Sequence, residues 1–174
     1  MRGLAMVILL GSLVGCGSAG SPGRWVKDMG GTLHDAHAQR AQAALALLAP
    51  PPNVRVRVLD VESVGAYAWP DGQIFVTRGL VDLLTQPELV AAIAHEAGHL
   101  MDGGHLRAPR ALHGYGSDPD AEVRADAAGA SLLRQRGLDA RVMSSMLDKV
   151  CASPAAPASC RPGLRRRIQA LARR

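Results

Sequence analysis

Aromatic residues are scarce in this chain, and their scarcity narrows the classes of function that it permits. Only 3% of its 174 residues are Phe, Trp or Tyr. Proteins that bind single-stranded nucleic acid stack bases on aromatic rings, so the composition argues against nucleic-acid recognition despite a net charge of +5. Much of the positive charge gathers on a predicted C-terminal helix, as is typical of a solvated helix face.

Long hydrophobic runs are also lacking, and no segment beyond the first fifteen residues has the length and apolarity of a membrane span. The apolar run 4–14 follows Arg2 and is itself too short to span, which is the layout of a signal peptide. It ends in Leu13-Val14-Gly15-Cys16, which resembles a bacterial lipoprotein signal with cleavage before Cys16 and lipidation of that cysteine. An ordinary secretory peptide with an incidental cysteine is the alternative.

The residues around this cysteine predict the arrangement of the processed protein. Residues 1–15 form the signal peptide, 16–24 form a flexible tether rich in Gly, Ser and Pro, and 25–174 form one domain. Gly17 stands where an aspartate tends to retain lipoproteins at the inner membrane. We therefore expect a lipid anchor in the bacterial cell envelope, at the outer membrane and facing the periplasm.

Cysteine is the third scarce residue, with three in the chain. Once Cys16 is assigned to the lipid, Cys151 and Cys160 remain, and they flank a segment rich in Ala, Ser and Pro. In an oxidising compartment we expect them to form a disulfide, with free buried thiols as the alternative. Closing a ring of about ten residues stabilises a fold by roughly 2.7 kcal/mol.

Hydrophobic periodicity predicts a small sheet among helices. A helix that begins after Thr85 is indicated by the capping-box spacing of Thr85 and Glu88. A three-stranded sheet with helices before and after it is an α+β domain. The other helices are expected over 33–48, 79–84, 119–136, 138–150 and 163–174, and the strands over 54–58, 67–69 and 74–77.

The helix after Thr85 carries the motif His95-Glu96-Ala97-Gly98-His99. Residues four apart lie on one helix face, so His95 and His99 can bind one zinc ion, while Glu96 can act as a base on water. The alternatives without a metal are a helix on the surface and two histidines that are hydrogen-bonded in the core. An apolar helix would not normally continue into two histidines and a glutamate, because burying unpaired polar groups is costly.

Catalytic zinc usually takes three protein ligands, and the motif offers two candidates for the third. His105 has the spacing of the third ligand in metzincins, although Asp102 stands where those enzymes have glycine. Glu122 lies on a later helix, four residues before Asp126, which could orient a ligand histidine through a hydrogen bond. The motif alone favours Glu122 but leaves both open.

Three separated motifs resemble those of the gluzincin metallopeptidases. They are the segment 65–80, the pair of histidines with Glu96, and Glu122-Val123-Arg124-Ala125-Asp126. The chain is similar to the family of the type 1 CAAX prenyl protease, heat-shock protease X and the periplasmic beta-barrel assembly-enhancing protease. The resemblance implies a minigluzincin-like domain in which His95, His99 and Glu122 bind one zinc ion per chain. It further implies that Glu96 is the base and that Asp126 supports a histidine.

The same resemblance implies further roles and shows two departures. The strand containing Ile74, Phe75 and Val76 would be the edge to which extended substrate adds. Arg167 matches a family arginine and would stabilise the oxyanion or form a structural salt bridge. Relatives commonly have Asn in place of Gly65 and a His-Pro pair in place of Arg161-Pro162.

These observations predict a zinc-dependent metalloendopeptidase, anchored to the membrane through lipidated Cys16, that hydrolyses unfolded or extended envelope polypeptides. A lipoprotein adaptor or holdase with a structural or vestigial zinc site is the alternative from another class. A metzincin-like site with His105 as third ligand is the alternative mechanism. A membrane-embedded prenyl protease is disfavoured by the absence of a span.

Overall fold

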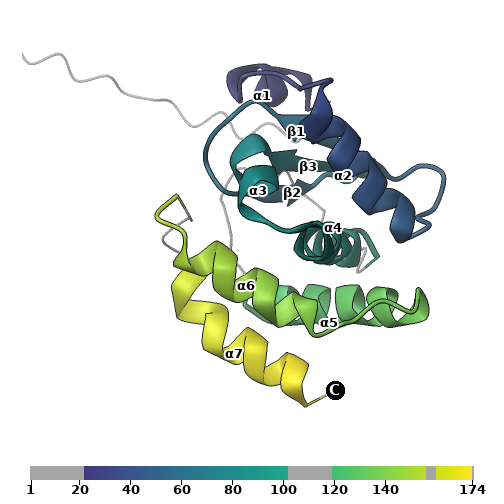
Figure 1. Ribbon diagram of the computed structural model, residues 1–174, viewed down its shortest axis with the longest axis vertical. Helices are drawn as coiled ribbons and strands as arrows, with labels where there is room; N and C mark the ends of the chain where they lie inside the picture. Colours follow the sequence, from purple (N-terminus) through teal and green to yellow (C-terminus); the bar gives the residue numbers. More distant parts are fainter. Residues whose placement is uncertain (1–21, 102–118, 156–159, 174) are drawn as a thin grey trace, which may run out of the picture.

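The computed structural model describes residues 22–101, 119–155 and 160–173. Helices surround a small three-stranded sheet, which confirms the predicted α+β class (Figure 1). No helix within these described ranges is long and apolar enough to cross a bilayer. The elements in chain order are α1 (Gly23–Asp28), α2 (Ala36–Leu47), β1 (Arg55–Leu59), β2 (Ala66–Ala68), β3 (Gln73–Thr77), α3 (Arg78–Leu83), α4 (Gln86–Met101), α5 (Pro119–Gln135), α6 (Val142–Ala152) and α7 (Cys160–Ala172).

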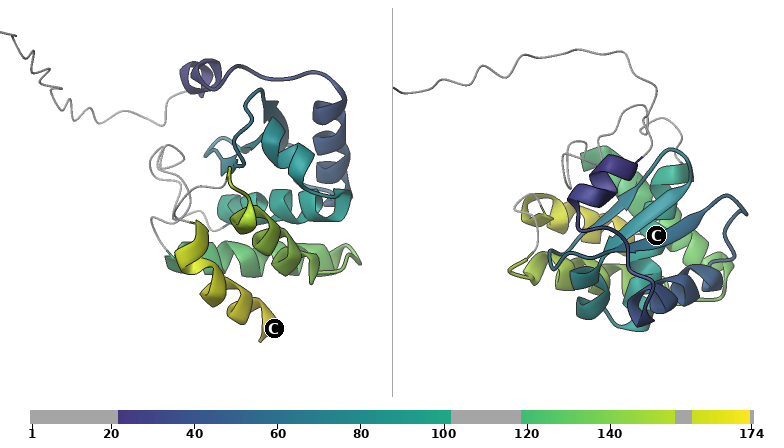
Figure 2. Two further views of the ribbon diagram at one scale, coloured as in Figure 1. Left: turned by 60° about the vertical axis from the view of Figure 1, so that its left-hand side comes forward. Right: turned by 90° about the horizontal axis from the view of Figure 1, so that it is seen from above.

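Helix α4 lies at the centre of the molecule. It contacts the sheet and α2 on one side and α5 and α6 on the other, as Figures 1 and 2 show. Every residue from Glu88 to Gly98 is buried. A helix buried on all sides must be apolar or have its polar groups satisfied, so the polar side chains of α4 must find partners on neighbouring elements.

The strand order of the sheet is β1-β3-β2, with β3 parallel to β1 and antiparallel to β2. Ile74, Phe75 and Val76 on β3 are fully buried. The prediction that this strand is the edge that receives substrate is wrong, because both sides of its backbone are hydrogen-bonded to neighbouring strands. The edge strand that contacts α4 is β2.

The outer face of the sheet is covered by α1. The ring of Trp25 stacks on Trp69 at a centroid distance of 5.4 Å and contacts Phe75 edge-on at 5.3 Å. Helix α1 therefore includes Gly23 and Arg24, which the sequence assigned to the flexible tether. The predicted domain start at residue 25 falls inside this helix, because Trp25 packs its ring on the apolar face of the sheet.

Several helix boundaries differ from the predicted ones for local reasons. Helix α2 starts later than expected because the backbone N–H of Leu33 donates to Val58 and extends the sheet instead. Helix α6 starts four residues late because Asp139 accepts a hydrogen bond from the N–H of Arg141 in a turn. Helix α7 begins at Cys160, and the proline at its third residue lies in the first turn, where it is tolerated.

Glu88 joins the start of α4 to α6. Its carboxylate accepts hydrogen bonds from the N–H of Thr85 at 2.8 Å, the hydroxyl of Ser145 at 2.8 Å and the ammonium of Lys149 at 2.9 Å. Glu88 therefore makes the bond to the Thr85 N–H that the predicted capping box requires, and the Thr85 hydroxyl donates to the same carboxylate. Ser145 and Lys149 of α6 are two added partners. Although burial alone raises the pKa of Glu88, the hydrogen bonds from Thr85, Lys149 and Ser145 lower it to about 2.

Replacing this carboxylate with an amide should destabilise the domain. We expect Glu88→Gln to lower the free energy of unfolding at neutral pH by about 2 kcal/mol, because hydrogen bonds to a charged acceptor are lost. The folded pKa of about 2 lies below the ordinary 4.5. The stabilisation is therefore fully present above the ordinary value and is lost as the pH falls toward 2. Urea unfolding across this pH range measures both effects.

The matched control is Glu62→Gln, because the Glu62 side chain is 86% exposed. Such a surface change should alter the free energy of unfolding by less than about 0.5 kcal/mol. A difference between Glu88→Gln and the unchanged protein that stays constant down to low pH would contradict the assigned role of the charge.

Candidate metal centre

Two helices bring three ligand-type side chains together. His95 and His99 come from α4 and Glu122 comes from the first turns of α5. The Nε2 atoms of the two histidines are 3.1 Å apart, and each lies 3.4 Å from an oxygen of Glu122. All the candidate ligand atoms lie within 4.8 Å of one another, so this group could hold a metal ion.

The spacing of these donors fits zinc. Zinc binds histidine nitrogen and carboxylate oxygen at about 2.0–2.2 Å in tetrahedral geometry, which places neighbouring donor atoms about 3.3–3.6 Å apart. The observed separations of 3.1, 3.4 and 3.4 Å are close to this value, with Oε2 of Glu122 facing His95 and Oε1 facing His99. Glu122 Oε2 is also buried without a hydrogen bond of acceptable geometry to the described residues. A buried carboxylate oxygen in this state is a suitable ligand for a cation.

The site exists because α4 and α5 cross at very short range. A Cβ atom at Gly98 would lie 2.5 Å from the carbonyl oxygen of Ala125, and one at Gly129 would lie 2.9 Å from the carbonyl of Ala94. Only glycine permits this contact between the two backbones, because any side chain would push the helices apart. The close crossing lets a carboxylate as short as that of Asp126 reach α4.

Asp126 fixes the orientation of the His95 ring through a contact with its Nδ1 atom. Its Oδ1 lies 2.9 Å from Nδ1 of His95, which leaves Nε2 as the nitrogen that points toward Glu122 and His99. Asp126 is 1% exposed and belongs to the second turn of α5. A hydrogen bond of this kind fixes the ring orientation and the tautomer of a ligand histidine.

Arg167 from α7 holds both carboxylates of α5. Its Nε and Nη2 donate to the two oxygens of Asp126, each at 2.7 Å, and its Nη1 lies 3.1 Å from Glu122 Oε2. The side chain is buried at 5% exposure. The structural salt bridge is therefore the observed role of Arg167, since the guanidinium faces carboxylates rather than open space.

Burial, hydrogen bonds and neighbouring charges shift the pKa values of His95, Glu122 and Glu96. Burial lowers the pKa of His95, but hydrogen bonds to Asp126 and Glu122 outweigh it and raise the pKa to about 10 in the absence of a metal. Burial raises the pKa of Glu122, but His95, His99 and Arg167 hold it well below its ordinary value. Burial raises the pKa of Glu96 above its ordinary range, which suits a group that must accept and return a proton near neutral pH.

The structure thus brings together six of the residues predicted from the sequence, on three helices. They are His95, Glu96 and His99 on α4, Glu122 and Asp126 on α5, and Arg167 on α7. It places Ile74, Phe75 and Val76 in the middle of the sheet instead. Cys16 and His105 lie outside the described residues. Arg161 lies away from the metal group, and its Nε donates to the carbonyl of Cys151.

Sequence reasoning missed the two glycines at the helix crossing. Gly98 and Gly129 each interrupt an otherwise helical pattern, where glycine costs about 1 kcal/mol relative to alanine. A glycine retained in a buried helix usually has a packing reason, so this pattern was the signal that could have revealed the close contact.

The fold and the donor set together are those of a small zincin-like domain. Residues 31–115 match the model of peptidase family M48, a match that supports a peptidase of that zinc-dependent metallopeptidase family. The matched segment contains the sheet and α4 with both histidines and Glu96, and it ends before α5. The assignment of Glu122 to the site therefore rests on the distances in the structure and not on the family match. No curated protein matches the chain.

The geometry distinguishes the two candidates for the third ligand. We expect Glu122→Ala to weaken zinc binding by at least 100-fold, because the site loses its only carboxylate donor among the described residues. His105→Ala should leave the affinity within about threefold, a change smaller than 1 kcal/mol. Competition with a chromophoric chelator measures both. Loss of zinc from the His105 variant, with retention by the Glu122 variant, would favour the metzincin-like arrangement.

Proposed function

We propose that this protein is a zinc-dependent metalloendopeptidase that cleaves unfolded or extended polypeptides of the bacterial cell envelope. The observation that carries the proposal is the close group of donor atoms from His95, His99 and Glu122, together with the buried carboxylate of Glu96. The match to a peptidase family over the segment that contains α4 supports the same reaction. A peptidase of this kind acts on polypeptide substrates.

The residues of the chain have distinct parts in the proposed reaction. His95, His99 and Glu122 would hold the zinc ion, which supplies Lewis acidity for the scissile carbonyl and makes water a nucleophile at neutral pH. Glu96 accepts a proton from the attacking water and returns it to the nitrogen of the leaving amine. Its carboxylate is close enough to both histidines for their charges to act on its pKa.

Arg167 acts in this scheme as a positioning residue. Its three guanidinium nitrogens are directed at Asp126 and Glu122, so it fixes carboxylates that orient or bind the metal. This geometry favours the salt-bridge hypothesis over the oxyanion hypothesis for Arg167. The negative charge of the tetrahedral intermediate then needs a donor other than Arg167, in addition to zinc.

Extended substrate would add to β2 rather than to β3. The N–H of Trp69 donates to Gln73, and the carbonyl of Gly65 accepts from Thr77, so alternate residues of this strand face β3. Ala66 and Ala68 therefore direct their N–H and C=O groups away from β3, toward the free side of the strand. Because β2 contacts α4, a peptide paired with this edge would run beside the metal centre.

Removing the base should separate metal binding from catalysis. We expect Glu96→Gln to retain one zinc ion per chain, because Glu96 is not among the grouped ligands. Its rate of peptide cleavage should fall by about 10²–10⁴-fold, because the proton acceptor is lost. Metal analysis and cleavage of a fluorescent casein substrate, on the same preparations, measure the two quantities.

The substrate provides the control for this experiment. A permanently unfolded polypeptide should be cleaved, while the same sequence held in a folded domain should resist, because strand addition requires an extended backbone. Unchanged cleavage by Glu96→Gln would remove Glu96 from its assigned role. Zinc binding without cleavage of either substrate by the unchanged protein would instead favour the adaptor or holdase.

The envelope location is proposed from the lipoprotein-like signal that ends at Cys16. We expect Cys16→Ser to move the protein from the membrane fraction to the soluble periplasmic fraction, because several acyl chains on one cysteine provide the membrane affinity. Fractionation with immunodetection measures this shift, and mass spectrometry of the mature N-terminus identifies the acyl groups. An unmodified Cys16, or membrane association that persists in Cys16→Ser, would contradict the anchor.

A further inference from the structure

Helix α7 packs on the rest of the domain through three half-buried apolar side chains and two fully buried residues. Among its described side chains only Cys160 and Arg167 are fully buried, while Leu164, Ile168 and Leu171 are half-buried and pack against the main core. A helix of thirteen residues is marginal in water on its own, so its contacts with the domain hold it in place. The apolar contacts hold α7 on the domain, and its two buried attachments fix its position along α5 and α6.

The first attachment is the disulfide between Cys151 and Cys160. It joins the last turn of α6 to the first residue of α7, with a Cα–Cα distance of 5.4 Å, and both cysteines are buried. Helix α6 is itself fixed to α4 because Ser145 and Lys149 donate to Glu88. The start of α7 is thus tied covalently to an element that is anchored on the metal-site helix.

The second attachment is the pair of salt bridges that Arg167 makes with Asp126 and Glu122. Arg167 lies two turns after Cys160, so any displacement of the helix start moves the guanidinium relative to α5. The two attachments close a ring that runs from α4 through α6, the disulfide, α7 and Arg167 back to the carboxylates beside His95.

We propose that the Cys151–Cys160 disulfide sets the metal affinity of the site, by holding Arg167 in register with Asp126 and Glu122. This inference rests on the proposed zinc site. It adds that the oxidation state of Cys151 and Cys160 controls the affinity of that site for zinc. A dithiol reductant would break the S–S bond by thiol–disulfide exchange. Two electrons and two protons pass to the cysteines, giving two thiols, and the reductant becomes a disulfide.

Two effects of losing Arg167 oppose each other. Removing a cation from the site strengthens the binding of another cation, whereas releasing the two carboxylates lets them turn away from the geometry that zinc requires. We expect orientation to decide, because partners that fix metal ligands typically contribute 10–100-fold in affinity. The positive charge of Arg167 is also already offset by Asp126, which it contacts through two hydrogen bonds.

The test compares zinc affinity in the oxidised and reduced states of the full chain. A Cys16→Ser background leaves Cys151 and Cys160 as the only cysteines. Competition with a chromophoric chelator should show 10–100-fold weaker zinc binding after reduction with a non-chelating phosphine and its removal. The double variant Cys151→Ala with Cys160→Ala should show the same loss, which excludes new thiol ligands as the cause.

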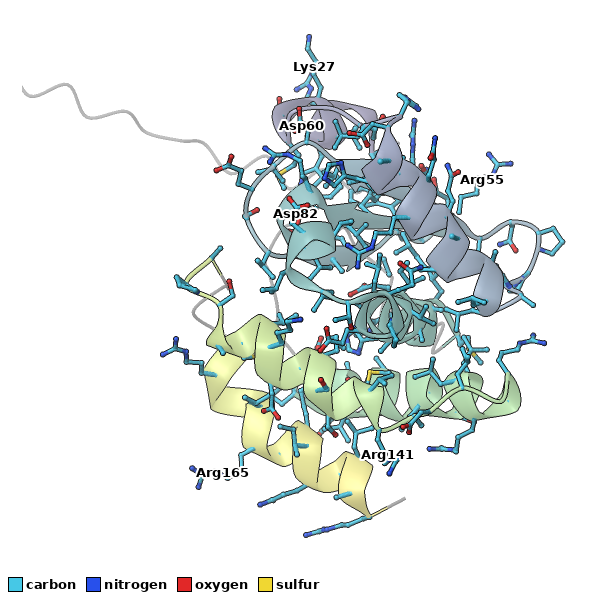
Figure 3. The ribbon with its side chains drawn as sticks, in the orientation of Figure 1. Lys27, Arg55, Asp60, Asp82, Arg141 and Arg165 are labelled. Carbon is cyan, nitrogen blue, oxygen red and sulfur yellow. A yellow bond between two sulfur atoms is a disulfide. The ribbon has the colours of Figure 1, made fainter. Side chains whose placement is uncertain are left out.

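A thermodynamic cycle tests whether the disulfide affects zinc affinity through Arg167. Arg167→Lys keeps the charge but cannot donate to both oxygens of Asp126, so it should lose affinity by a similar factor in the oxidised state. Reduction should then cause no more than a threefold further loss, because the two changes act through one contact. The matched control is Arg165→Lys on the same helix, where Figure 3 shows the side chain pointing away from the neighbouring helices.

Hydrogen exchange distinguishes a local effect from general unfolding. Reduction should speed amide exchange in α7 while α2 and α4 keep their protection. Equal zinc affinity in both redox states, additive losses in the cycle, or loss of protection throughout the domain would each overturn the proposal. A protein that binds zinc in a redox-dependent way but cleaves nothing would contradict the proposed peptidase and leave this inference standing.

Discussion

The close crossing of α4 and α5 is the contact on which the rest of the molecule depends. Gly98 and Gly129 let the two helix backbones touch, and this contact places the short side chain of Asp126 within hydrogen-bond distance of His95. The i and i+4 spacing of the histidines supplies only half of a metal site. A wider crossing would separate Glu122 and Asp126 from the histidines and leave two buried carboxylates with the single positive charge of Arg167, which is costly.

The buried side chains around the site carry a net negative charge when both histidines are neutral. The carboxylates of Glu96, Glu122 and Asp126 carry three negative charges in a largely buried region, and Arg167 supplies one positive charge. With both histidines neutral, as metal ligands must be, the remaining charge of about −2 is that which a divalent cation would neutralise. The high pKa of His95 without metal has the same origin, because a proton there offsets part of this charge.

The sequence allowed the local features to be predicted and left the long-range ones open. The alternating valines of β1 and the capping box at Thr85 and Glu88 depend on neighbours in the chain, so their patterns were sufficient. The order of three short strands is decided by which backbone edges pair in space. Hydrophobic periodicity carries no information on that order, so the interior strand β3 was mistaken for the edge strand.

The same distinction applies within the site, and it explains the position of Arg167. Three arginines occur in succession at 165–167, and helical periodicity makes all of them candidates for a solvated face. Only the third turns inward, because α7 starts where the disulfide to α6 fixes it and that start sets which face meets α5. A buried guanidinium is stable only with carboxylates to receive it, and Asp126 and Glu122 are the carboxylates that also face His95. The C-terminal helix and the histidine motif are therefore joined by one set of charges, although they are far apart in the sequence.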